Sequence, residues 1–234
     1  SPSASPGDNT PLGWTADGTQ IVYDGTAQGT AHIFLLDSLG ASRRAIANPP
    51  NGNDKWASYS RDGQWLYFNN AIGCQGLFRA RSDGSAATSM VADPCQASIW
   101  GRASSSPDGS KTAVWGVNTG IAILDAATGD TTLLYALGLN PSTVYPARWS
   151  PDGQHLAFDI NTDIWLIAPA GGSPVQFTSL SIGSYAPLGF DWSPDSQWLI
   201  AQRQNGGVDL LRLADGLRLP LAWGLRLVGT AWKP

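Results

Sequence analysis

The chain has 234 residues, of which 42% are hydrophobic and 14% charged, and its formal net charge is −4. This composition provides a large apolar core but no basic face. It therefore argues against nucleic-acid binding, which depends on neutralising phosphates. No apolar stretch approaches the ~20 residues of a membrane-spanning helix, so we expect no direct membrane insertion of this segment. The 11 Trp, 27 Gly and 16 Pro favour an all-β fold with many tight turns.

The N-terminal residues 1–10 are rich in Ser and Pro and are predicted to form a flexible leader. Residues 11–234 are predicted to form one domain. A leader of this kind is typical of exported proteins in which a signal sequence or a membrane anchor lies upstream. A cut in a longer chain would leave the same composition, so both interpretations stay open.

A short motif recurs five times along the predicted domain. It consists of an aromatic residue or Ser, then Ser or Thr, a spacer, Asp and usually Gly, and it occupies residues 14–18, 59–63, 105–109, 149–153 and 192–196. The Asp residues are 45, 46, 44 and 43 positions apart. A period of this length predicts supersecondary units that bury their apolar faces only by stacking on copies of themselves. Because the Asp recurs in every copy, we interpret it as a turn residue and not as a catalytic acid.

Each repeat contains four short segments with strand character, separated by turns. The fourth repeat shows this most clearly, with strands predicted at 146–150, 155–160, 163–168 and 175–178. The other repeats follow the same plan, with strands predicted after the motif at 20–24, 32–37 and 43–47, at 65–69, 76–81 and 88–92, at 111–117, 121–125 and 131–135, and at 198–202, 208–213 and 218–221. Four-stranded antiparallel sheets arranged around an axis form a β-propeller.

The fourth repeat resembles the repeat of the TolB-like β-propellers. The resemblance is carried by the sequences Trp-Ser-Pro-Asp-Gly at 149–153, Leu-Ala-Phe at 156–158, Asp-Ile-Trp-Leu at 163–166 and Gly-Gly at 171–172. It extends over nearly the whole chain and becomes weaker at Tyr59 and Ser105. The resemblance implies a propeller of four-stranded blades, and it implies a protein that docks partner proteins in an envelope context.

The number of blades and the closure of the ring stay open. We favour five blades, with the strand-like residues 225–232 serving as the inner strand of the first sheet beside residues 20–47. This C-terminal strand would close the ring and protect sheet edges that would otherwise be exposed. Residues 10–13 look like a poor strand. The alternative is six blades, with the last blade incomplete or supplied by another chain.

The two cysteines, Cys74 and Cys95, lie in connections that an up-and-down sheet brings to the same edge. We therefore expect a disulfide between them, provided that their Cα atoms come within ~7 Å. A disulfide favours an extracytoplasmic location, which is periplasmic, on the cell surface or secreted.

The sequence gives no indication of catalysis or of a cofactor. It has two His, His32 and His155, in separate repeats, and it lacks the common motifs of hydrolases, kinases and dinucleotide-binding enzymes. The segment 159–163 spaces oxygen ligands like a calcium loop but lacks the central Gly and the distal Glu, so we predict no metal site. We expect no enzyme activity, and a hydrolase or a lyase is the less favoured alternative.

Aromatic and Arg residues that do not follow the repeat lie where the chain approaches each first strand, and these places meet at one rim of a propeller. Both residue types are enriched in the energetically dominant positions of protein interfaces. We therefore predict a non-catalytic binding or scaffold module that recognises a protein partner at this rim, and a carbohydrate-binding propeller is the alternative. The predicted binding residues are Trp56, Trp100, Arg102, Tyr145, Arg148, Tyr185 and Trp223.

Overall fold

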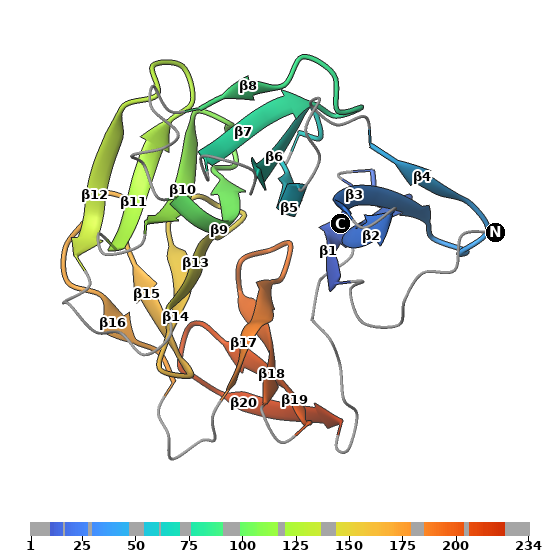
Figure 1. Cartoon of the computed structure of the whole chain (residues 1–234). Coiled ribbons are helices and arrows are strands. Elements are labelled where there is room, and N and C mark those ends of the chain that lie inside the picture. Colours follow the sequence, from blue (N-terminus) through green and yellow to red (C-terminus); the bar gives the residue numbers. More distant parts are fainter. Residues whose placement is uncertain are drawn as a thin grey trace.

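The protein is a β-propeller of five four-stranded antiparallel sheets, as seen in a computed structural model (Figure 1). The structure describes residues 10–15, 17–27, 30–46, 54–60, 62–70, 76–90, 99–116, 120–136, 144–178, 185–203 and 206–222. Within these ranges there is no helix, and hence no helix that could span a membrane. The predicted all-β propeller with five blades is confirmed.

Each blade is formed by four consecutive strands, the first of them inner and the last outer (Figure 1). The strands are, for blade 1, β1 (Thr10–Trp14), β2 (Gln20–Ala27), β3 (Thr30–Asp37) and β4 (Arg43–Ala45); for blade 2, β5 (Asp54–Tyr59), β6 (Trp65–Asn70), β7 (Gly76–Arg81) and β8 (Thr88–Ser89); for blade 3, β9 (Ile99–Ser105), β10 (Lys111–Gly116), β11 (Gly120–Asp125) and β12 (Thr131–Ala136); for blade 4, β13 (Val144–Trp149), β14 (Leu156–Ile160), β15 (Asp163–Ile167) and β16 (Val175–Gln176); and for blade 5, β17 (Tyr185–Trp192), β18 (Trp198–Arg203), β19 (Val208–Arg212) and β20 (Arg218–Ala222).

The repeated motif forms the turn between the first and second strands of every blade. The motif hydroxyl donates a hydrogen bond to the Asp Oδ1 at 2.5–2.6 Å in all five copies. The same hydroxyl accepts the backbone N–H five residues further on, at 2.9–3.1 Å. The Asp Oδ1 also accepts the N–H two residues further on, at 3.0–3.1 Å. The recurring Asp therefore has the structural role that its recurrence predicts.

The strand register places the two kinds of connection at opposite ends of the propeller. In blades 2 to 5 the first strand begins opposite the end of the second, in the pairs Asp54↔Asn70, Ile99↔Gly116, Val144↔Ile160 and Tyr185↔Arg203. In blade 1 Thr10 is opposite Asp24, three residues before β2 ends. We call this end the upper rim and the end with the motif turns the lower rim. All five motif turns therefore lie on one side of the ring.

The hydrophobic core lies between neighbouring blades and is divided into four clusters. These clusters join blade 1 to blade 2, blade 2 to blade 3, blade 3 to blade 4 and blade 4 to blade 5. The fourth, for example, packs Ala157 and Ile164 of blade 4 against Phe190, Leu199 and Leu211 of blade 5. Blades 2, 3 and 4 thus have an apolar side-chain layer on both faces, as the sequence predicts for sheets stacked on one another.

The inner strand of blade 1 differs from the predicted one. Residues 10–14 form β1, although they look like a poor strand, and β1 pairs with β2 through a register shift between Pro11 and Gly13. Pro has no backbone N–H to donate. It is compatible with an edge strand, because on the free side no further strand needs a donor there. The position beside β2 that we expected residues 225–232 to occupy is therefore taken by β1. Residues 223–234 themselves lie outside the described part of the chain.

Candidate binding rim

The first strand of every blade has an irregularity close to the upper rim. The register shifts between Pro11 and Gly13 in β1, between Lys55 and Ser58 in β5, and at the corresponding place in β9, β13 and β17. Such β-bulges bend a strand and redirect its side chains, and they are common beside functional sites. The propeller thus carries a ring of five bulges around its axis at this end.

Trp56 lies in the bulge of β5 and has an unusual backbone conformation. Its φ is 55°, in the left-handed region that bulky residues rarely adopt. Its backbone N–H donates to Asp24 Oδ2 of blade 1 at 3.4 Å, so the bulge is linked to the neighbouring blade. Trp56 is half-buried, whereas Asp54 and Ala57, which lie close to it in the sequence, are buried. Trp56 is therefore a partly exposed aromatic residue in the part of β5 close to the upper rim.

Four other predicted binding residues lie in inner strands near this rim. Trp100 is opposite Trp115, Tyr145 is opposite Asp159, and Tyr185 is opposite Arg203. Arg102 lies in the bulge of β9, where the register shifts between Ala113 and Trp115. The structure describes the backbone of these residues but not their side chains. Trp223, Cys74 and Cys95 lie outside the described residues.

Arg148 is part of the contact between two blades. Its guanidinium forms an ion pair with Asp191 of blade 5 at 3.2 Å and lies 5.3 Å from the centre of the Phe190 ring. Its carbonyl accepts a hydrogen bond from Trp192 Nε1 at 3.1 Å. Arg148 directly precedes Trp149 at the lower end of β13, so the structure separates it from the predicted residues that begin the inner strands.

Asp159 is a buried acid that the sequence motifs do not single out. It lies at the upper end of β14, is fully buried, and accepts the Thr162 N–H at its Oδ1 at 3.2 Å. Among the described residues, no group hydrogen-bonds to its Oδ2. Burial raises the pKa of Asp159 to about 7, against the effect of the Thr162 hydrogen bond, and the nearby Asp163 adds to the rise. The signal in the sequence is an Asp that interrupts the apolar run from Leu156 to Ile160.

Blade 5 contains a buried carboxylate between two guanidinium groups near the same rim. Asp209 Oδ2 lies 3.2 Å from Arg203 Nε and 2.7 Å from Arg218 Nε. The side chains of Asp209 and Arg203 are 0% and 4% exposed, so this ion pair is screened from water. Gly207 leaves room for this pair, since a Cβ there would lie 2.1 Å from an Arg203 terminal nitrogen and would displace the guanidinium. The network holds the upper end of blade 5 together.

The described residues contain no cluster of three or more His, Cys, Asp or Glu side chains that could hold a metal ion. Asp159 lies in β14 and Asp163 lies in β15, and the two acids have different hydrogen-bond partners. The Asp163 carboxylate accepts Thr178 Oγ1 at 3.3 Å and Gln176 Nε2 at 3.0 Å. These two acids are therefore engaged separately rather than as a pair converging on one ligand.

Comparisons with known proteins agree with this architecture. A curated relative from Agrobacterium fabrum, described as the uncharacterized protein Atu1656, is 25% identical over 158 residues, which are 62% of this chain and 53% of the relative. The chain thus spans about half the length of that relative. No family model matches the sequence.

Solved structures of TolB proteins superpose on most of the chain. A protein from Agrobacterium tumefaciens with a provisional TolB designation has a TM-score of 0.74 at 16% identity, covering 92% of this chain and 81% of that one. TolB from Acinetobacter baumannii has a TM-score of 0.70 at 19% identity, covering 92% and 55%. An oligogalacturonate lyase in complex with manganese has a TM-score of 0.63 at 15% identity, covering 92% and 65%.

The chain therefore has the TolB-like β-propeller fold, as the repeat motif predicts. At these identities the similarity shows the fold alone.

Proposed function

We propose that the chain is a binding or scaffold module that recognises a protein partner at its upper rim. The observation that carries this proposal is the half-buried Trp56, held in a left-handed backbone conformation within a β-bulge. Such a conformation costs about 1–3 kcal/mol and persists only where the surrounding structure imposes it. Strained residues of this kind are concentrated at binding and catalytic sites.

The arrangement of the rim supports recognition of an extended surface rather than of a small molecule. Trp56 and Arg102 occupy bulges in neighbouring inner strands, and Trp100, Tyr145 and Tyr185 begin or nearly begin their own strands. Trp, Tyr and Arg contribute most of the binding energy in protein interfaces. The TolB-like fold supports the same class of function, because the resemblance implies propellers that dock partner proteins.

We place the module outside the cytoplasm. This part of the proposal depends on a Cys74–Cys95 disulfide and on the resemblance to envelope propellers. Thiol titration of the unfolded chain, with and without reductant, tests the first point. Two reactive thiols without reductant would contradict the disulfide.

Affinity capture from an envelope extract tests binding at the rim. The bait is the whole chain as wild type, as Trp56→Ala and as Arg102→Ala, with Trp65→Ala as the matched control. Trp65 is also half-buried but begins β6 at the lower rim. We expect proteins that the wild type and Trp65→Ala both retain to be lost from the two rim variants.

Equal recovery of every protein by all four baits would contradict the proposal. Thermal melting must show that the variants are folded. A carbohydrate-binding function is the competing outcome, and it would appear as glycan-array binding that Trp56→Ala abolishes while protein recovery stays unchanged.

A further inference from the structure

Blade 2 differs from the other blades at one position of its third strand, where it has an arginine. The position lies opposite the fifth residue after the motif Asp, and in blade 2 it pairs Arg79 with Tyr67. The residues that the other blades have at this position are all aliphatic: Leu35, Ile123, Leu166 and Leu210. A charged residue at an otherwise apolar repeat position departs from the pattern that favours stacked sheets, and such departures are expected at functional sites.

Arg79 lies on the same face of β7 as Arg81, and both guanidinium groups lie close to one aromatic ring. Arg81 is opposite Trp65 in the β6–β7 pair. The central carbons of the two guanidinium groups lie 4.3 and 4.6 Å from the centre of the Trp65 ring. Arg79 Nη1 also donates to the Ala126 carbonyl of blade 3 at 3.1 Å, which places this side chain where blades 2 and 3 meet. Arg81 is exposed, so solvent reaches this arginine cluster, which consists of Trp65, Arg79 and Arg81.

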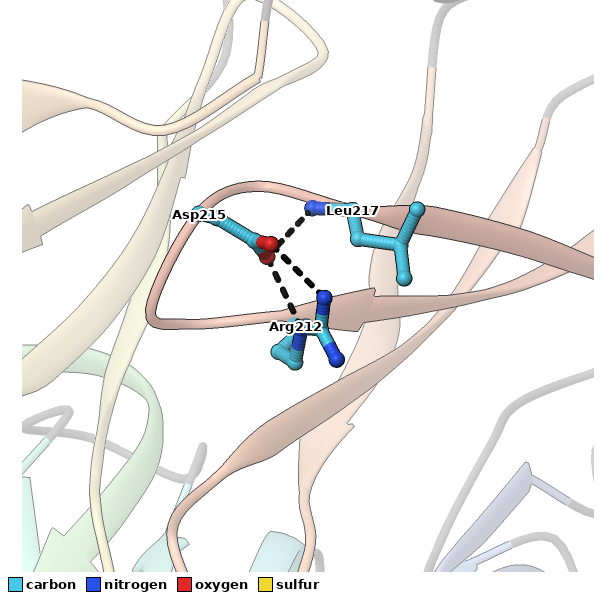
Figure 2. A network of polar contacts seen from close by, with 3 residues as sticks. All are labelled: Arg212, Asp215 and Leu217. Atoms are coloured by element: carbon cyan, nitrogen blue, oxygen red, sulfur yellow. Dashed lines mark hydrogen bonds and ion pairs between the residues drawn. The ribbon is translucent and has the colours of Figure 1, made fainter.

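Blade 5 has the same Trp–Arg pair, but an acid of its own compensates the charge. Arg212 is opposite Trp198, and its guanidinium lies 5.6 Å from the centre of the Trp198 ring. Figure 2 shows Asp215 accepting hydrogen bonds from Arg212 Nε and Nη2 at 2.9 and 2.7 Å and from the Leu217 N–H at 3.1 Å. The side-chain hydrogen bonds from Arg212 lower the pKa of Asp215 to about 2. The positive charge beside Trp198 is therefore paired within its own hairpin.

The corresponding acid of blade 2 has other partners. Like Asp215, Asp83 precedes a glycine with positive φ and accepts the N–H two residues further on, that of Ser85, at 2.8 Å. The Ser85 hydrogen bonds lower the pKa of Asp83, and the guanidinium that adds to this effect is that of Arg44 in blade 1. Within the described part of the chain, the two guanidinium groups of the arginine cluster form no ion pair. Blade 2 thus has two positive charges beside its Trp where blade 5 has one compensated charge.

We propose that the arginine cluster binds an acidic segment of a partner protein in an extended conformation. Arg79 and Arg81 are two residues apart on one strand face, a spacing of about 6.6 Å, and side chains on one face of an extended peptide repeat with the same spacing. Carboxylates at alternate positions of such a segment would each meet one guanidinium, in charge-assisted hydrogen bonds. The two guanidinium groups repel each other, and bound carboxylates relieve this repulsion.

This surface is separate from the upper rim. Trp65 begins β6 and Arg81 ends β7, so both lie toward the lower rim, beyond the motif turn of blade 2. The inference therefore does not depend on the function proposed for the upper rim, and either one can fail alone.

Fluorescence anisotropy of a labelled octapeptide, measured with the full chain at low ionic strength, tests the inference. The probe alternates Glu and Thr, and the control peptide alternates Gln and Thr. We expect the wild type to bind the Glu peptide and not the Gln peptide. Arg79→Gln and Arg81→Gln should each weaken binding about fivefold, because each removes one ion pair at a solvent-accessible site.

Two matched variants serve as controls. Arg212→Gln removes the same charge from the equivalent Trp–Arg pair of blade 5, and it should leave binding of the Glu peptide unchanged. Trp56→Ala alters the upper rim and should also leave it unchanged. Thermal melting checks that the variants are folded. If Arg79→Gln unfolds because its contact with blade 3 is lost, Arg81→Gln at its exposed position carries the test.

Four results would overturn the inference. The first is a wild type that does not bind the Glu peptide. The second is equal weakening by Arg81→Gln and Arg212→Gln, which would mean that binding follows the net charge of the chain. The third is equally tight binding of an octapeptide that alternates Glu pairs with Thr pairs, because its acids never lie two residues apart. The fourth is displacement of the Glu peptide by inorganic phosphate but not by chloride at the same ionic strength, which would assign the cluster to a small anion.

Discussion

Ser196 Oγ accepts a hydrogen bond from the backbone N–H of Asp152 at 2.9 Å, and this contact joins the motif turns of blades 4 and 5. Ser196 occupies the position that Gly holds in the other four motif turns, and its φ is 61°. One residue thus combines a favourable contact between blades with an unfavourable backbone conformation.

Two substitutions at Ser196 separate these effects. Ser196→Ala should destabilise the fold by about 1 kcal/mol, because the Asp152 N–H loses its acceptor in this part-buried contact while the left-handed conformation remains. Ser196→Gly loses the same hydrogen bond but relieves about 1 kcal/mol of backbone cost, so its stability should stay closer to that of the wild type. Urea denaturation measures both. Equal destabilisation by the two variants would show that the conformation of this turn carries no cost.

Removing a motif hydroxyl should lower the free energy of unfolding, although the group is small. Ser150 is fully buried, donates to Asp152 Oδ1 at 2.5 Å and accepts the His155 N–H at 2.9 Å. Ser150→Ala leaves the His155 N–H without its acceptor and removes one of the two hydrogen bonds to Asp152 Oδ1, so we expect a loss of about 1–3 kcal/mol in the free energy of unfolding. Ser38→Ala is the control, since Ser38 is exposed, and its effect should stay within about 0.5 kcal/mol.

Asp159 should make the stability depend on pH. Its pKa is about 7 in the folded protein, well above that of an exposed Asp, so the folded state holds a proton that the unfolded chain releases. The contribution of this proton is complete below about pH 4 and is lost as the pH rises through 7. Asp159→Asn keeps a neutral side chain, so its stability relative to the wild type should increase between pH 4 and 8, by at most about 4 kcal/mol. A difference that does not change over this range would contradict the raised pKa.

The ion-pair network of blade 5 predicts unequal effects for its members. Asp209→Asn leaves the buried Arg203 without its compensating charge, and removing one partner of a buried pair costs about 3–5 kcal/mol. Arg218→Ala removes a side chain that is 27% exposed and leaves the Arg203–Asp209 pair in place, so we expect a smaller loss. Thermal melting of both variants gives the comparison. A larger loss of stability for Arg218→Ala than for Asp209→Asn would contradict the conclusion that Arg203 depends on Asp209 for its compensating charge.

The motif turns and the blade plan could be predicted from sequence because they depend on local chemistry. The Ser or Thr hydroxyl, the Asp and the Gly at residues 149–153 form their hydrogen bonds within six residues of one another. The weak strand at 10–14 could not be recognised, since Pro11 and Gly13 disfavour a strand in isolation. Its pairing with β2 and its place at the inner edge decide the outcome.

The predicted binding rim shows the limits of the same reasoning. Repeat spacing brings Trp100, Tyr145 and Tyr185 to the upper ends of inner strands, where we expected them. Repeat spacing does not predict the bulge that places Trp56 in a left-handed conformation. Nor does it show that Arg148 pairs with Asp191, because this contact forms only when blades 4 and 5 stack. The burial of Asp159 likewise depends on neighbouring sheets.

The central claim is that a protein partner binds across the beginnings of the inner strands. Its most direct test is the exchange footprint of the full chain bound to a partner recovered by affinity capture. We predict slowed amide exchange at residues 54–56, 99–102, 144–145 and 185, with no change at the five motif turns. Protection concentrated at the motif turns, with the inner-strand beginnings unchanged, would contradict the account.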